Sequence, residues 1–275
     1  MAVLDDKVAI VTGSARGIGR ATAEILSEQG AKVLINDLDG DVAEQTASEI
    51  KGDTLVFGGD LTQQGVPDEL VQKVIDEWGR VDILVNNAGY TLDAPIHKMS
   101  DEWFQKMLDI HSIVPFRMCR AVAPHMREPA KQEKEEGREV FRKIVNVTSI
   151  SGTMGNAGQA NYSSGKAAVT GLTKTLAKEW GQFKINVNAV AFGYIETRLT
   201  ASKDEANVAE IAGEKVQLGI PDQLRGMASM LIPLGRPGTP QEAASAVFLL
   251  CSPWANFIHG QIINVTGGQF SGMYT

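Results

Sequence analysis

Short apolar runs and longer amphipathic stretches alternate along the chain. Runs rich in β-branched residues, apolar through most of their length as in strands buried on both faces, predict strands at 7–12, 32–36, 54–57, 82–86, 143–149, 185–190 and 261–266. Between these runs the apolar residues follow helical spacing, which predicts helices within 19–30, 67–79, 101–126, 167–181 and 240–252. Strands that alternate with helices are typical of parallel sheets with right-handed crossovers. The pattern predicts an α/β fold, and we expect one domain over residues 1–275.

Two longer segments interrupt the alternation. Residues 127–142 carry dense mixed charge, which is typical of a solvated helical extension; a docking surface for a charged partner is the alternative. Residues 198–239 are too long for a simple connection, and they include a pattern that predicts a helix at 204–217. Long loops in compact domains are often functional, so we expect a substrate lid at about 198–239.

Composition narrows the class of protein. The net charge of −7 argues against a nucleic-acid binder, which needs a basic face to neutralise phosphates. No apolar run approaches the ~20 residues of a membrane span, and the N-terminal segment does not resemble a secretory signal. Cys119 and Cys251 have no partner at metal-ligand spacing, so we expect neither a disulfide framework nor a metal site. A reducing cytoplasm is the expected location.

A glycine-rich turn joins the first predicted strand to the first helix. Gly13, Gly17 and Gly19 allow a tight turn and a close approach of the backbone to a pyrophosphate, which the N-terminal end of the helix attracts. Asp37 ends the second strand, 18 residues past Gly19, where a carboxylate can bind an adenosine ribose and repel a 2′-phosphate. The segment predicts a dinucleotide site; an ordinary turn with a surface aspartate is the alternative.

Tyr162 and Lys166 lie four residues apart at the start of a predicted helix, so their side chains share a face. A nearby ammonium favours a phenolate, and we expect it to lower the pKa of Tyr162 so that the phenol can act as acid or base. Ser149 ends the preceding strand, where a hydroxyl can polarise a substrate carbonyl. An exposed pair that arises by chance is the alternative.

These motifs together resemble the short-chain dehydrogenase/reductase family over nearly the whole chain. The resemblance rests on TGSARGIG (12–19), Asp60 after the third strand, NNAG (86–89), Ser149, Tyr162, Lys166 and VTGG (265–268). Within the family, residues 149–168 are most similar to the bacterial 3-oxoacyl-acyl-carrier-protein reductases. The resemblance implies a doubly wound Rossmann-type domain, with seven parallel strands in the order 3-2-1-4-5-6-7 and helices on both faces.

The family pattern also implies residue roles. Tyr162 would exchange a proton with the substrate oxygen, Ser149 would orient that oxygen, and Lys166 would tune Tyr162 and bind the nicotinamide ribose. Asp60 would contact the adenine, and Ile195 and Thr197 would hold the nicotinamide. The implied cofactor site consists of Gly13, Ser14, Arg16, Gly17, Ile18, Gly19, Asp37, Asp60, Leu61, Asn87, Ala88, Gly89, Tyr162, Lys166, Ile195 and Thr197.

Three positions depart from the family pattern. Phe192-Gly193 stands where the family has Pro-Gly after the sixth strand, which removes one rigid φ from the loop that meets nicotinamide. The segment 198–239 is longer than in the short reductases. His111 stands where the family has an asparagine that holds a water in a proton relay.

An imidazole can donate and accept hydrogen bonds and titrates near neutrality, so His111 can take over this catalytic role. Alternatively the ring only packs, and the backbone carbonyl alone holds the water.

The chain is therefore expected to be an NAD(H)-dependent oxidoreductase that interconverts a secondary alcohol and a ketone. NADP(H) is the less favoured cofactor, because Asp37 opposes a 2′-phosphate that Arg16 could bind. The favoured substrate is a 3-oxoacyl or 3-hydroxyacyl thioester, and a steroid, sugar or other small alcohol is the alternative. A catalytically inactive dinucleotide-binding regulator is the alternative from another class. By resemblance, we expect a homotetramer or a dimer.

Overall fold

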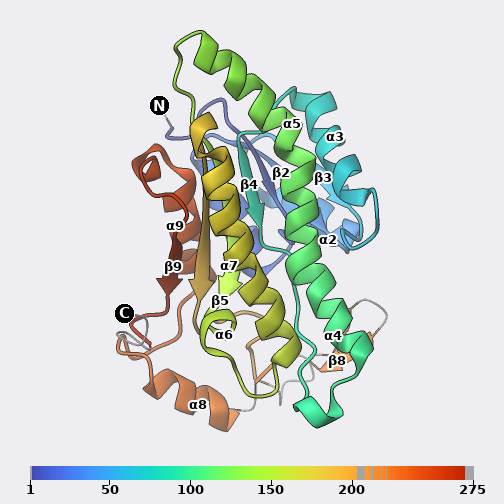
Figure 1. The fold of residues 1–275 in the computed structure, drawn as a ribbon. Helices are drawn as coiled ribbons and strands as arrows, with labels where there is room; N and C mark the ends of the chain where they lie inside the picture. Colours follow the sequence, from blue (N-terminus) through green and yellow to red (C-terminus); the bar gives the residue numbers. More distant parts are fainter. Residues whose placement is uncertain (1, 203–207, 212–213, 218, 221, 270–275) are drawn as a thin grey trace.

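All seven predicted strands form, and they lie in one parallel sheet (Figure 1). The computed structural model describes residues 2–202, 208–211, 214–217, 219–220 and 222–269. The strands of the sheet are β1 (Val8–Val11), β2 (Lys32–Asp37), β3 (Thr54–Gly58), β4 (Ile83–Asn86), β5 (Arg142–Ser149), β6 (Ile185–Phe192) and β9 (Ile262–Val265). Each predicted strand differs from the observed one by at most two residues at either end.

The strand order is β3-β2-β1-β4-β5-β6-β9, which is the expected order 3-2-1-4-5-6-7 counted over the strands of this sheet. All residues of β1, β4, β5 and β6 are buried, whereas the edge strands β3 and β9 are partly exposed. The chain reverses its direction of winding between β1 and β4. A crevice at the carboxyl ends of these two strands is where such folds bind ligands.

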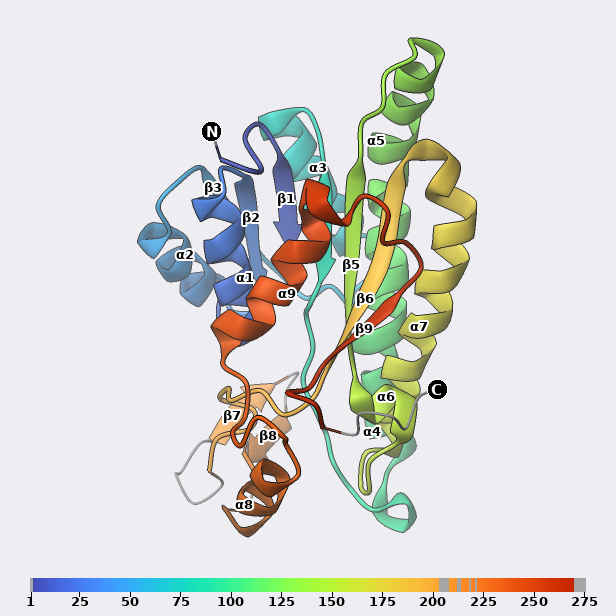
Figure 2. The same ribbon diagram turned by 90° about the vertical axis from the view of Figure 1, so that its left-hand side faces the viewer.

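Helices cover both faces of the sheet, as Figures 1 and 2 show. The first face carries α1 (Gly17–Glu28), α2 (Gly40–Glu49) and α9 (Pro240–Cys251), which contribute to one hydrophobic core. The other face carries α3 (Val66–Trp78), α4 (Asp101–Leu108), α5 (Val114–Glu135) and α7 (Ala160–Trp180), which contribute to a second core. The short helix α6 (Ile150–Met154) follows β5 directly. Helix α2 was not among the predicted elements.

The predicted helix over 101–126 contains a π-helical turn at Asp109–Ile113, between α4 and α5. In this turn the N–H of Val114 donates to the carbonyl of Asp109, five residues earlier. Pro115 has no N–H to donate to the carbonyl of His111, four residues before it, so a regular α-helical bond is impossible there. The sequence thus accounts for a widened turn at His111, and such turns often mark functional sites.

The prediction of a helix at 204–217 is wrong. Strands β7 (Val208–Ile211) and β8 (Glu214–Gln217) pair there as an antiparallel hairpin, and helix α8 (Asp222–Met230) follows. Gly213 lies in the middle of the predicted helix, where glycine costs about 1 kcal/mol relative to alanine. Valine and isoleucine around it favour strands instead.

The charged segment 127–142 continues helix α5 as far as Glu135, and Figure 2 shows the end of this helix standing away from the sheet. Arg142 at the start of β5 is 4% exposed and forms two hydrogen bonds with Glu133, of 2.8 and 2.9 Å. This buried ion pair fixes the return of the chain from the projecting helix into the sheet. At least this part of the segment therefore has a structural role.

Three further observations concern a membrane span, a metal site and the cysteines. Within the part of the chain that the structure describes, no helix is long and apolar enough to cross a membrane. The same residues include no cluster of three His, Cys, Asp or Glu side chains that could hold a metal ion. Cys119 and Cys251 are both buried and free.

Candidate active site

The carboxyl ends of the parallel strands bring the candidate site residues to one edge of the sheet. The elements that meet there are the glycine-rich turn after β1, Asp37 at the end of β2, Asp60 after β3, Asn87–Gly89 after β4, Ser149 at the end of β5, and Ile195–Thr197 after β6. This edge is where the fold places ligands. Residues that are far apart in the sequence thus lie at the carboxyl ends of neighbouring strands.

The glycine-rich turn has the backbone geometry of an anion site. Gly13 and Gly17 have φ angles of 62° and 56°, which favour glycine, and a Cβ on Gly13 would lie 2.7 Å from the Cα of Ala88. In the described chain, no side chain caps the start of α1 at Arg16, and no acidic residue lies in its first turn. Its first N–H groups can therefore bind a pyrophosphate, and the residues present fit a dinucleotide.

Ser14 holds the turn from inside. Its Oγ donates to the carbonyl of Val11 at 2.7 Å and accepts from the N–H of Asn36 at 3.0 Å, and the residue is fully buried. Asn87 has a similar role, because its amide donates to the carbonyls of Thr12 and Gly13 at 3.0 and 2.9 Å. The backbone N–H groups of Ser14 and Asn87 are also bonded within the protein, to the carbonyl of Asn36 and the hydroxyl of Thr12, so both residues shape the turn and offer a ligand no free donor.

The loop after β6 lies over the glycine-rich turn. A Cβ on Gly17 would lie 3.8 Å from Cγ2 of Thr197, while Ile195 is buried and pairs with Gly238. The loop begins at Phe192, which pairs with β5 and β9, and the N–H of Gly193 donates to the carbonyl of Val265 at 3.0 Å. The sheet ladder thus fixes the path of the loop without the usual proline.

Asp37 lies where a ribose would approach. Its Oδ2 accepts from the N–H of Ala15 at 3.3 Å, and burial raises the pKa of its carboxyl. Arg16 does not pair with Asp37, because its NH2 lies 3.4 Å from Oδ2 of Asp39. Sequence reasoning missed Asp39, although an aspartate immediately before a helix is a signal for an N-cap.

Asp60 and Leu61 follow β3 beside the crevice. Oδ1 of Asp60 accepts from the N–H and the hydroxyl of Thr62, at 2.9 and 2.7 Å. Leu61 is 4% exposed and belongs to the core. The Asp60 carboxylate is therefore held in one orientation, and Leu61 can contribute its backbone only.

Ser149, Tyr162 and Lys166 come together at the start of α7. Nζ of Lys166 lies 5.7 Å from the centroid of the Tyr162 ring and donates to the carbonyl of Val147 at 2.7 Å. Ser149 is close enough to Tyr162 to lower the pKa of its phenol, while Ser149 Oγ donates to the carbonyl of Phe192 at 3.5 Å and accepts from the N–H of Ser151 at 3.1 Å. A hydroxyl, a phenol and an amine thus lie near one another at the expected edge.

The electrostatics differ from the expectation. Burial raises the pKa of Tyr162 to about 12, and the hydrogen bond with Ser149 offsets only part of this shift. Burial lowers the pKa of Lys166 to about 7. The prediction of a lowered tyrosine pKa is wrong for this arrangement, because desolvation of the phenolate outweighs the interactions that lower the pKa. At neutral pH the phenol is protonated.

His111 packs between the loop after β4 and helix α7. The residue is 2% exposed, and its Nε2 lies 2.7 Å from the carbonyl oxygen of Tyr90. Its ring packs edge to face with the Tyr162 ring, with 4.9 Å between the ring centroids and 87° between the ring planes. A Cβ on Gly89 would lie 2.9 Å from Nδ1 of this imidazole, so the glycine makes room for the ring. Among the described residues Nδ1 has no hydrogen-bond partner. Sequence reasoning gave no role to Tyr90.

The prediction that His111 titrates near neutrality is wrong. Burial, followed by the positive charge of Lys166, lowers the pKa of the imidazole well below its ordinary value. A carbonyl oxygen can only accept, so the proton of the neutral ring resides on Nε2, and Nδ1 is an acceptor.

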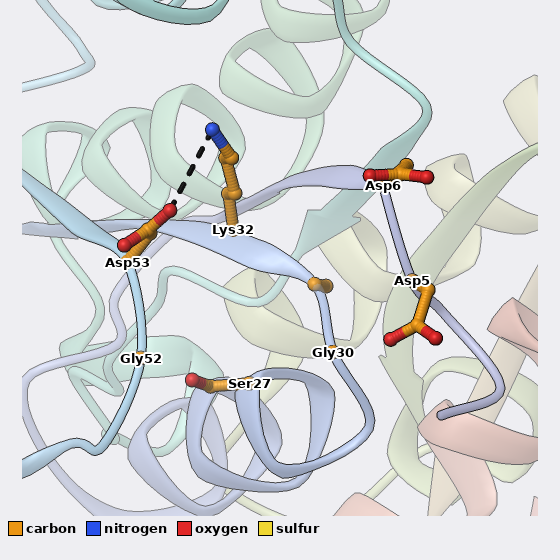
Figure 3. Close-up of a pocket in the computed structure, with 8 residues that line it drawn as sticks. Asp5, Asp6, Ser27, Gly30, Lys32, Gly52 and Asp53 are labelled. Carbon is orange, nitrogen blue, oxygen red and sulfur yellow. Dashed lines mark ion pairs between the residues drawn. The ribbon is translucent and has the colours of Figure 1, made fainter. Parts of the chain in front are cut away.

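A pocket at the other edge of the sheet is not part of this site. Asp5, Asp6, Gly30, Lys32 and Asp53 line it, and an ion pair of 3.5 Å joins the last two (Figure 3). These residues precede or begin β1, β2 and β3, so the pocket lies at the amino ends of the strands. Ligands of such folds bind at the carboxyl ends.

Known proteins resemble the chain over almost its whole length. The family model described as Enoyl-(Acyl carrier protein) reductase matches residues 13–269. The 3-oxoacyl-[acyl-carrier-protein] reductase FabG of Vibrio cholerae is 39% identical over 97% of this chain and 98% of its own. The proteins of the same name from Thermotoga maritima and Escherichia coli are each 36% identical, over 96% and 97% of this chain and 98% of their own. The chain belongs to the short-chain dehydrogenase/reductase family of nicotinamide-dependent oxidoreductases, and it is an oxidoreductase of the class that acts on CH–OH groups.

Proposed function

We propose that the protein reduces 3-oxoacyl thioesters, with NADH as the reductant. The carrying observation is the grouping of Ser149, Tyr162 and Lys166 at the carboxyl edge of the sheet, beside a glycine-rich turn that fits a pyrophosphate. The names of the relatives, all 3-oxoacyl-[acyl-carrier-protein] reductases, support an acyl thioester as the substrate.

The protonation state of Tyr162 supports the direction of reduction. A phenol with a pKa of about 12 holds its proton at neutral pH and can donate it to a carbonyl oxygen. Ser149 donates a second hydrogen bond to that oxygen, and Lys166 returns a proton to Tyr162. When bound, the nicotinamide supplies the hydride.

A preference for NAD(H) follows from the charges at the end of β2. Asp37 can accept hydrogen bonds from the ribose hydroxyls, and its carboxylate repels a 2′-phosphate. NADP(H) lacks a matching cation there, because Arg16 is already paired with Asp39.

A substrate lid over about 198–239 remains a proposal, and residues 203–207, 212–213, 218 and 221 of it lie outside the described residues. Arg225 of α8 supports it: its Nε donates to the hydroxyl of Tyr194 and its NH2 to Glu196, each at 3.0 Å. These two residues flank Ile195, which would hold the nicotinamide. Movement of α8 is thereby coupled to the cofactor end of the site.

His111 acts in this proposal as a positioning residue and not as a relay. A proton cannot pass through the ring, because Nε2 faces the Tyr90 carbonyl, which does not take up a proton. The neutral ring instead holds the Tyr90 backbone and supports one edge of the Tyr162 ring.

A homotetramer or dimer and a cytoplasmic location stay predictions. Exposed apolar side chains on one flank, Leu249, Trp254, Phe257 and Ile263, are compatible with a subunit interface. Light scattering that gives the mass of a monomer would exclude an oligomer.

Replacing Tyr162 by phenylalanine should lower kcat for a 3-oxoacyl thioester by roughly 10²- to 10⁴-fold, because the proton donor is lost. The Kd for NADH should stay unchanged. Ser164→Ala removes an exposed hydroxyl from the same helix and should keep the wild-type kcat. If the protein consumes NADH with ketones of other classes and with no acyl thioester, one of the alternative dehydrogenases is favoured. If it binds NADH but turns over no substrate, the inactive regulator is favoured.

Wild-type kcat/KM should be higher with NADH than with NADPH, and Asp37→Ala should reduce this preference by removing the repulsion of the 2′-phosphate. The measurement is a comparison of kcat/KM for both cofactors in both proteins. A wild-type enzyme that prefers NADPH would refute the proposed cofactor.

Trypsin cleavage within 198–239 should slow when NAD⁺ and a substrate analogue are added together, because closure shields the backbone. Cleavage within 127–142 serves as the internal control and should not change. Equal cleavage of the lid with and without these ligands would remove the support for closure.

Replacing His111 by alanine should lower kcat by roughly 10- to 100-fold, because Tyr162 loses its lateral support and a small displacement is costly. The shape of the profile of kcat against pH between 6 and 8 should be the same in wild type, His111→Asn and His111→Ala, since burial keeps the imidazole neutral in this range. A change of kcat near pH 6–7 that is seen in the wild type but in neither variant would show that the imidazole titrates. It would support the alternative that His111 is part of a proton relay.

A further inference from the structure

Arg16 and Asp39 form a small charge cluster with Asp37 at the adenosine end of the crevice. The guanidinium NH2 of Arg16 lies 3.4 Å from Oδ2 of Asp39, and the two side chains are 46% and 48% exposed. Arg16 belongs to the glycine-rich turn, and Asp39 lies two residues after the end of β2. The only basic side chain of the turn is therefore directed to the start of α2.

Other hydrogen bonds hold Asp39 in this orientation. Its Oδ1 accepts from the N–H of Val42 at 3.3 Å and so caps helix α2. Its own N–H donates to Oδ1 of Asp37 at 3.3 Å. One carboxylate oxygen is thus committed to the helix, and the other remains for Arg16.

We propose that Asp39 is a second specificity-determining residue, which restrains Arg16 and thereby weakens binding of a 2′-phosphorylated dinucleotide. A guanidinium binds a phosphate with strong charge-assisted hydrogen bonds, but here it must first leave Asp39. The inference rests on the proposed function, because it assumes that a dinucleotide binds at this turn. It goes beyond the repulsion by Asp37, since it assigns a role to the ion pair of Arg16, the basic residue of the glycine-rich turn.

The test is the affinity of the protein for each dinucleotide alone, measured by calorimetry without any substrate. Asp39→Asn keeps a good N-cap residue, so the start of α2 should be preserved while the charge is lost. The Kd for NADPH should fall by about 2- to 5-fold, the modest effect expected when an exposed ion pair is released, and the Kd for NADH should change little. Asp41→Asn removes the same charge from the exposed first turn of α2 and serves as the control.

A double-mutant cycle identifies the route of the effect. In the Arg16→Ala background, Asp39→Asn should no longer improve NADPH binding, because the freed guanidinium is absent. An improvement that persists there, or an equal improvement in Asp41→Asn, would show general repulsion and overturn the inference. Unchanged NADPH affinity in Asp39→Asn would overturn it as well. A wild-type protein that binds neither dinucleotide would instead refute the proposed function.

Discussion

The hydroxyl of Thr12 is the contact on which the arrangement of the site depends. It accepts from the N–H groups of Asn87 and Ala88, both at 3.0 Å, and donates to the carbonyl of Val85 at 3.4 Å. Two loops that leave β1 and β4 at the centre of the sheet are thereby joined where their backbones are closest. Buried backbone groups at the end of a parallel ladder need such partners, since the next strand no longer supplies them. This junction positions both the glycine-rich turn and the loop that contains Gly89.

The reacting groups depend on the same junction through packing. Gly89 leaves room for the His111 ring, the ring meets Tyr162, and Tyr162 lies one helical turn before Lys166. The closeness that positions these groups also removes their water. Desolvation then keeps the phenol protonated, the imidazole neutral and the amine only partly charged, so the set is prepared to donate a proton.

The sheet was predictable because parallel strands that are buried on both faces are short continuous apolar runs. A helix buries one face only, so its apolar residues are spaced apart. Helix α2 escaped prediction since it buries only Ala43 and Thr46, and its N-cap at Asp39 carries much of its definition. Helix α2 was thus missed because its stability does not come from a regular apolar face. The hairpin at β7 and β8 stands where a helix was predicted at 204–217, although Gly213 argues against a helix there.

The site was predictable where the chemistry depends on local spacing and was not predictable where it depends on neighbours in space. Tyr162 and Lys166 are found from a separation of four residues, and the glycine-rich turn from its place between a strand and a helix. The partner of Arg16 is 23 residues away, and no periodicity links the two. The sign of the tyrosine pKa shift was misjudged for the same reason, because a count of nearby charges omits the water that the fold removes. Burial therefore has to be known before the charge on a neighbouring lysine can be used in the argument.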